Sequence, residues 1–186
     1  MINDPVHIDE DEMVAAFVEG ERSSPLLRHR YEDCINSREV DDATLLGCVR
    51  GYPDMGLFKC FPNDVVWTRG TLPFEAQMRC KYLNQREWEL LAGSSDRRTH
   101  EASRHIAENV EFSNRRIIEN VKAIREIFES KQAPHGQVIL VKRPQDNFAI
   151  MLEGNKRLTA NLMFSEPFVL EAILGESCRM DEWHFY

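Results

Sequence analysis

One stretch of sequence decides the fold, and it reads Phe148-Ala149-Ile150-Met151-Leu152-Glu153-Gly154-Asn155-Lys156-Arg157-Leu158-Thr159-Ala160. Its first part, 148–152, is apolar throughout, which predicts a buried strand. An amphipathic run follows from Leu158 to Phe164 and stops before Pro167, which predicts a helix. Gly154 lies between the two, where the backbone has to turn tightly. The sequence therefore predicts a strand, a turn and a helix in direct succession.

The turn at 153–157 carries groups that bind anions. The first N–H groups of the helix lack partners, the helix dipole is positive at this end, and Lys156 and Arg157 add two cations. The planar guanidinium of Arg157 suits a phosphate better than the ammonium of Lys156 does, and Asn155 is a common turn former. Glu153 is a candidate to hold Mg²⁺ or to orient a water molecule. We therefore expect a nucleotide phosphate here, the alternative being an ordinary strand-to-helix connection with exposed charges.

The same turn resembles the signature of the ParB/sulfiredoxin superfamily. The matching residues are Gly154, Arg157 and Ala160, with Glu153 as in the variants that read Glu/Asp-Gly-His-His-Arg. The resemblance extends back to about Arg116. It implies an α+β fold with a small mixed β-sheet flanked by helices, and a nucleotide held by residues 154–157. Sulfiredoxins have a reactive cysteine in this turn, and this sequence has none there, which argues against sulfiredoxin chemistry.

Within the superfamily, size, architecture and motif are most similar to the plasmid fertility-inhibition (oncogenic suppression activity) branch. That branch is associated with ATP hydrolysis and with cleavage of DNA that leaves through a conjugation apparatus. The resemblance thus implies ATP and Mg²⁺ as cofactors. It also implies plasmid or transferred DNA as a partner, together with components of a conjugation or type IV secretion system. Glu153 and Arg157 would be the catalytic residues, and Glu153 the residue that positions Mg²⁺. No helix-turn-helix pattern follows the motif, which argues against a partition protein.

Two other classes of function stay open on the sequence. A small-molecule kinase that phosphorylates a free amino acid would use the same turn. A non-catalytic inhibitor or interaction protein would use its acidic surface instead, and would not hydrolyse a nucleotide. A Walker-type phosphate loop is absent from the sequence, so any use of ATP is expected to depend on the turn at Gly154.

Charge is distributed unevenly along the chain. The net charge of −8 argues against a general nucleic-acid binder. Residues 97–157, however, hold 12 basic and 8 acidic side chains, a local +4. We therefore expect DNA to lie along this segment, in contact with Arg97, Arg98, Arg115 and Arg116.

Length and composition indicate one globular domain, 1–186, in which about the first 63 residues form an N-terminal extension. The hydrophobic share of 42% and the lack of long apolar runs predict a protein that does not insert into membranes. The acidic N-terminus lacks a signal-peptide pattern, so we expect a cytoplasmic protein. Five widely spaced cysteines then predict reduced thiols and argue against disulfides or a zinc site.

Other elements follow from periodicity. Residues 64–69 read as a strand, 83–91 and 103–128 as helices with a break near 113–114, and 137–142 as a central strand. Residues 168–174 are apolar and read as a strand or a helix. Val14, Phe17 and Val18 are spaced as in a short amphipathic helix that would start at Asp9 to Asp11. For residues 1–24 as a whole we expect a solvated arm or a short cap helix, and for 183–186 an edge strand.

Overall fold

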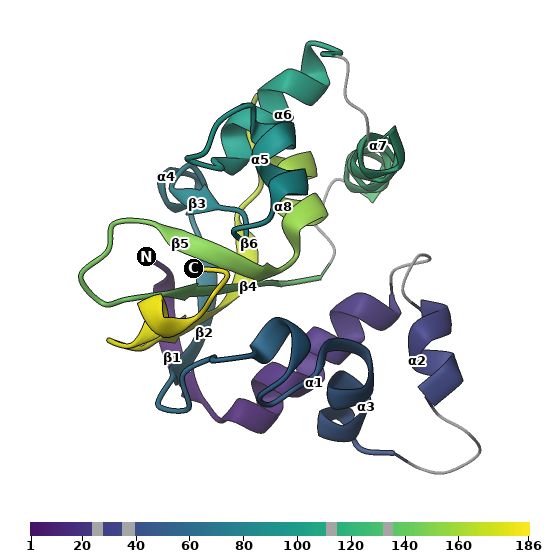
Figure 1. Ribbon diagram of the computed structural model, residues 1–186. Helices are drawn as coiled ribbons and strands as arrows, with labels where there is room; N and C mark the ends of the chain where they lie inside the picture. Colours follow the sequence, from purple (N-terminus) through teal and green to yellow (C-terminus); the bar gives the residue numbers. More distant parts are fainter. Residues whose placement is uncertain (24–27, 35–39, 111–114, 132–135) are drawn as a thin grey trace.

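The centre of the protein is an open, mixed six-stranded β-sheet (Figure 1). The computed structural model describes residues 1–23, 28–34, 40–110, 115–131 and 136–186. The strand order is β1-β2-β6-β4-β5-β3. The pairs β1–β2, β2–β6 and β4–β5 are antiparallel, whereas β6–β4 and β5–β3 are parallel. The predicted α+β class with a mixed sheet is confirmed.

The elements of the sheet and the helices around it have the following bounds. The strands are β1 (Asn3–Ile8), β2 (Val66–Leu72), β3 (Cys80–Lys81), β4 (Val138–Lys142), β5 (Ala149–Glu153) and β6 (Leu170–Glu176). The helices are α1 (Glu10–Arg22), α2 (Arg28–Cys34), α3 (Asp42–Arg50), α4 (Phe74–Gln77), α5 (Arg86–Ala92), α6 (Thr99–Ala107), α7 (Arg115–Lys131) and α8 (Asn155–Asn161). Two 3₁₀ turns, η1 (Gly56–Phe58) and η2 (Met180–Glu182), complete the described chain.

The two central strands carry apolar side chains on both faces, as the sequence predicted for 137–142. Alternate residues of β4 belong to different clusters: Ile139 and Val141 to one, Val138 and Leu140 to the other. The first cluster includes side chains of α1 and α3 and also of α5, α6 and α7, and the second includes side chains of α4 and α8. Helices cover both faces of the sheet: in Figure 1, α1–α3 lie on one side, and α4–α6 with α8 lie on the other.

The N-terminal segment is part of the core, and the expectation of a solvated arm was wrong. Residues 3–8 pair with β2 as the edge strand β1. Helix α1 buries Met13, Phe17 and Val18, and Asp9 caps it by accepting a hydrogen bond from Glu12 N at 2.8 Å. The acidic residues in the first turn of α1 led to the interpretation of this segment as solvated. The apolar residues that follow recur at helical spacing, and they form the buried face of α1.

Two further expectations were also wrong. The end of the chain is not a strand: η2 leads into Trp183, which is buried and donates from Nε1 to the Leu57 carbonyl at 2.8 Å. Cys34 and Cys48 form a disulfide between α2 and α3, whereas Cys60, Cys80 and Cys178 are free thiols. Spacing along the chain could not reveal this pair, because the packing of α2 against α3 brings the two residues together.

The strand and helix predictions around the motif agree with the structure in type, and their bounds differ by a few residues. The strand predicted at 64–69 is observed at 66–72 and the helix predicted at 83–91 at 86–92, whereas the helical segment predicted at 103–128 is divided into α6 at 99–107 and α7 at 115–131. Strands are observed at 138–142, 149–153 and 170–176. The break expected near 113–114 lies outside the described residues. Within the described ranges, no helix is long and apolar enough to cross a membrane.

Candidate functional site

The turn between β5 and α8 has the geometry that the sequence predicted. Gly154 adopts a left-handed conformation with φ of 90°, and α8 begins at Asn155. A Cβ atom at residue 154 would also lie 2.7 Å from Val138 Cγ1, at the start of the neighbouring strand β4. Both the backbone angle and the close approach of β4 therefore require glycine here.

Glu153 and Arg157 form an ion pair across this turn. Both side chains are largely buried, with 15% and 13% of their surface exposed. Two glycines frame the guanidinium: a Cβ at Gly20 in α1 would lie 3.0 Å from Arg157 Nη2, and a Cβ at Gly136 would lie 2.5 Å from Nη1. The N-terminal helix thus packs directly against the predicted site.

A second ion pair lies beside the first and comes entirely from the N-terminal helices. Glu21, only 3% exposed, accepts from Arg50 Nε at 2.8 Å and from Tyr31 Oη at 2.6 Å. Burial and the neighbouring carboxylate of Glu21 raise the pKa of Tyr31, so this phenol stays protonated and remains a donor. Glu21, Tyr31 and Arg50 were not predicted, because they come from three separate helices and share no motif.

The two ion pairs influence each other electrostatically. Burial is the main cause that raises the pKa of the Glu153 carboxyl, the cation of Arg157 opposes it, and the negative charge of Glu21 adds to it. Glu21 and Glu153 are therefore close enough to repel each other, with one arginine bound to each. The site is a cluster of two carboxylates and two guanidinium groups between α1, α3 and α8.

Lys156 is the cation of this cluster that has no bound counterion. Within the ranges that the structure describes, its Nζ has neither a hydrogen-bond nor an ion-pair partner. Burial lowers the pKa of Lys156, while the carboxylates of Glu153 and Glu87 act in the opposite direction. A partly buried ammonium in this position favours an anion as its partner.

Two further polar atoms of the turn, Asn155 Oδ1 and Arg157 Nε, are buried and have no hydrogen-bond partner in the part of the chain that the structure describes. Buried polar atoms in proteins are almost always hydrogen-bonded, so each such atom asks for a bound molecule or water. Asn155 Oδ1 is a hydrogen-bond acceptor, and Arg157 Nε is a donor. Thr159, in contrast, is fully satisfied, because its Oγ1 donates to the Asn155 carbonyl at 2.6 Å and contacts Tyr82 Oη at 2.5 Å.

The Glu153 carboxylate does not fit its expected role as a ligand of Mg²⁺. Among the described residues, no group of three His, Cys, Asp or Glu side chains could hold a metal. The carboxylate of Glu153, which was the expected Mg²⁺ ligand, is bound to Arg157. Mg²⁺ usually takes one or two free carboxylates in addition to substrate phosphates, so the Glu153 carboxylate as placed here does not fit that role.

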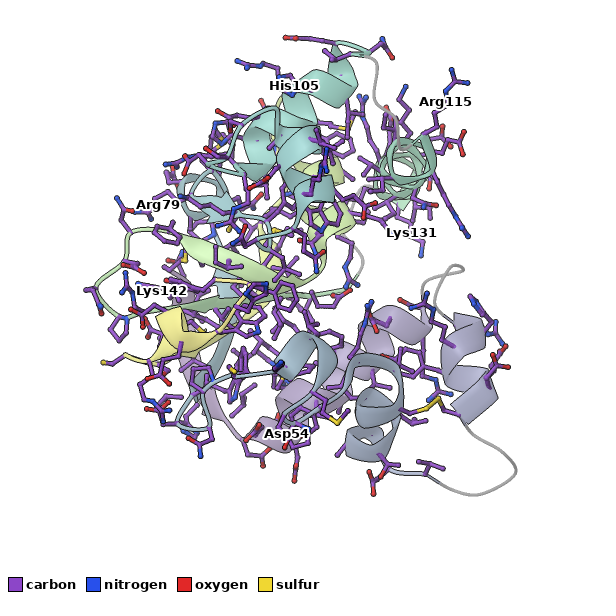
Figure 2. All side chains as sticks on the ribbon, in the orientation of Figure 1. Asp54, Arg79, His105, Arg115, Lys131 and Lys142 are labelled. Carbon is purple, nitrogen blue, oxygen red and sulfur yellow. A yellow bond between two sulfur atoms is a disulfide. The ribbon has the colours of Figure 1, made fainter. Side chains whose placement is uncertain are left out.

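The four arginines expected to contact DNA lie in two different settings. Arg97 donates to the backbone carbonyls of Tyr82 at 2.9 Å and of Tyr186 at 3.2 Å, and Arg98 pairs with Asp96. Arg115 and Arg116, at the start of α7, are exposed. Figure 2 shows Arg115 on the outer side of α7. Arg97 and Arg98 are therefore engaged by other groups of the protein, whereas Arg115 and Arg116 are exposed.

Comparison with known proteins gives no relative for this chain: no family model matches it, and neither a curated protein nor a solved structure does.

Proposed function

We propose that the protein binds a phosphate ester, of which a nucleotide is the leading candidate, at the turn between β5 and α8. The observation that carries this proposal is Lys156, a partly buried ammonium with no bound counterion among the described residues. The unpartnered Asn155 Oδ1 and Arg157 Nε support it, because a nucleotide offers both hydroxyl donors and phosphate acceptors. The resemblance of the turn to ParB and sulfiredoxin proteins supports the same ligand.

In this proposal Lys156 is the primary phosphate contact, and Arg157 is the second. Arg157 offers Nε while its Nη2 stays bound to Glu153. Glu153 holds the guanidinium in place, and Gly154 lets the backbone approach the ligand. The carboxylates of Glu21 and Glu153 repel every negative charge of the ligand that does not contact a cation. The turn itself therefore prefers a compact phosphate to a long polyanion.

The proposal extends to hydrolysis on the resemblance to the fertility-inhibition branch. In that extension the protein is a cytoplasmic ATPase and DNase that acts on plasmid or transferred DNA, with Arg115 and Arg116 as the exposed cations available to the DNA backbone. Any Mg²⁺ would arrive bound to the nucleotide, and no step is assigned to it here. Incubation with ATP and supercoiled plasmid measures phosphate release and nicking directly.

Binding itself is tested by calorimetric titration of the protein with ATP. Lys156→Gln removes the charge at the turn, and Lys59→Gln removes an equivalent charge from an exposed position outside the site. We expect the first variant to lose about tenfold or more in affinity, the usual effect of one charge-assisted hydrogen bond, and the second to bind like the parent. Equal binding by both variants, or no binding by the parent protein, would refute the proposal.

A further inference from the structure

The disulfide between Cys34 and Cys48 lies where a dissolved thiol can reach it. Cys48, in α3, is exposed, whereas Cys34, the last residue of α2, is partly buried against the core. In thiol–disulfide exchange a thiolate attacks one sulfur of the bond, so access to that sulfur decides whether the folded protein reacts. Cys48 therefore offers the point of attack.

Two other cysteines at the surface, Cys60 and Cys178, carry free thiols. Exposed thiols persist where reductants keep them reduced, and under such conditions a protein disulfide is usually transient, with a catalytic or redox-sensing role. Exposed disulfides are also more readily reduced than buried ones. An exposed disulfide beside exposed free thiols therefore favours a bond that opens and closes over one that stays closed.

The disulfide joins the two helices that donate hydrogen bonds to Glu21. Cys34 follows Tyr31 by three residues in α2, and Tyr31 Oη donates to the Glu21 carboxylate at 2.6 Å. Arg50 follows Cys48 by two residues in α3, and its Nε donates to the same carboxylate at 2.8 Å. Because α2 has only seven residues, it is too short to be stable alone. The bond to α3 therefore helps to hold the Tyr31 hydroxyl on Glu21.

The backbone of α1 connects Glu21 to the ion pair of the candidate site. Gly20 precedes Glu21, and a Cβ atom at Gly20 would lie 3.0 Å from Arg157 Nη2 and 3.1 Å from Glu153 Oε2. The end of α1 thus contacts the Glu153–Arg157 pair directly, and it cannot shift toward the turn without displacing that pair. A change in the bonds that Glu21 accepts therefore acts next to the candidate site.

We propose that Cys34 and Cys48 form a reversible redox switch, opened by a dithiol, that controls how firmly α2 holds the Tyr31 hydroxyl on Glu21. One thiolate of the dithiol attacks Cys48 Sγ, the bond between the two sulfurs breaks, and Cys34 leaves as a thiolate. The second thiolate of the dithiol then attacks the mixed disulfide and releases Cys48. The dithiol loses two electrons and two protons, and the two cysteines gain them.

The first test treats the folded parent protein with dithiothreitol and follows Cys34 and Cys48 by alkylation and peptide mass spectrometry. The folded protein reacts directly, so we expect a rate proportional to the dithiothreitol concentration and unchanged by urea below the unfolding transition. On reduction, the amides of residues 28–34 should exchange about tenfold faster or more, while circular dichroism shows that the protein stays folded. Oxidised glutathione should then restore the bond between Cys34 and Cys48. A bond that opens only as the protein unfolds, or a reduced protein that unfolds as a whole, would show that the disulfide is purely structural.

The second test follows the Nε–H signal of Arg50 by NMR, without any nucleotide, so its outcome does not depend on the proposed function. In the parent, reduction loosens Tyr31 from Glu21 and shifts this signal. Tyr31→Phe lacks the hydroxyl, so its oxidised form should already show the shifted signal, and reduction should move it little. Tyr52→Phe, which removes a hydroxyl bound to Glu10 at 2.8 Å, should respond like the parent. If reduction leaves the parent signal in place, or moves it equally in Tyr31→Phe, the disulfide does not act on Glu21 and the switch is refuted, whereas the proposed function stands.

Discussion

Removal of the disulfide between Cys34 and Cys48 is the perturbation whose size the structure defines best. The two cysteines are 14 residues apart. A closed loop of about this length lowers the conformational entropy of the unfolded chain, which raises the free energy of unfolding by about 3 kcal/mol at 25 °C. The bond joins α2 to α3, and Figure 2 shows it as a yellow bond between these helices. We expect Cys34→Ser/Cys48→Ser to lower the free energy of unfolding by about this amount.

The effect should be concentrated in α2, which has little else to hold it. This helix has seven residues, far fewer than the roughly 12 that an isolated helix needs, and Tyr31 is its one buried side chain. Among the described residues, α2 is otherwise held by Tyr31, which packs in the core and donates a hydrogen bond to Glu21. Loss of the disulfide therefore reaches the candidate site through Tyr31, by weakening one of the hydrogen bonds that Glu21 accepts.

Urea unfolding followed by tryptophan fluorescence measures the global change, and hydrogen exchange of residues 28–34 measures the local one. The matched control is Cys60→Ser/Cys178→Ser, which replaces two exposed free cysteines and should leave both readouts unchanged. If the disulfide variant has the same unfolding midpoint as this control, and its α2 amides exchange no faster than those of the parent, the bond does not stabilise α2 and the reasoning is refuted.

Three other predictions concern the scaffold around the site. Gly154→Ala should lower the free energy of unfolding by about 2–4 kcal/mol, because it combines a positive φ with a contact to Val138, and urea unfolding checks it. Tyr82→Phe should cost only about 1 kcal/mol in the same assay, because Thr159 keeps its bond to the backbone. Hydrogen bonds from Lys81 and Arg98 lower the pKa of Asp96, so its contribution to stability is present above pH 3.8 and is lost as pH falls through the lowered value. An NMR titration of the Asp96 carboxyl checks that direction, and a pKa at or above 3.8 would contradict it.

Local patterns were sufficient for the elements that build the sheet centre. The apolar run at 148–152 and the glycine at 154 predicted β5, the turn and α8, because each feature depends on neighbours in the sequence. The same holds for β4, whose residues are apolar on both faces. The acidic residues in the first turn of α1 led to the wrong expectation of a solvated arm at 1–24. In the structure these charges stabilise the start of a helix, and the opposite face of that helix is buried.

The candidate site was predicted only in the part that lies within one segment. Glu153, Gly154, Asn155, Lys156 and Arg157 adjoin each other in the structure because they adjoin each other in the chain. Glu21 and Arg50 are 29 residues apart, and only the packing of α1 on α3 makes them partners. One sequence signal could have drawn attention to them: Glu21 follows Phe17 and Val18 at helical spacing and so lies on the apolar face of the helix. A glutamate on such a face becomes buried and needs a cation nearby.

The structure also changes which residue of the turn is the better phosphate ligand. On its sequence, Arg157 is preferred, because a guanidinium can form two parallel hydrogen bonds to a phosphate. In the fold, its Nη2 is bound to Glu153, Gly20 lies against Nη2 and Gly136 against Nη1, so that binding through Nη2 would require the ion pair to open. Breaking a largely buried pair costs about 3–5 kcal/mol, more than a single phosphate contact returns. Lys156 has no such pair to break among the described residues, so a phosphate ligand gains the most at this ammonium.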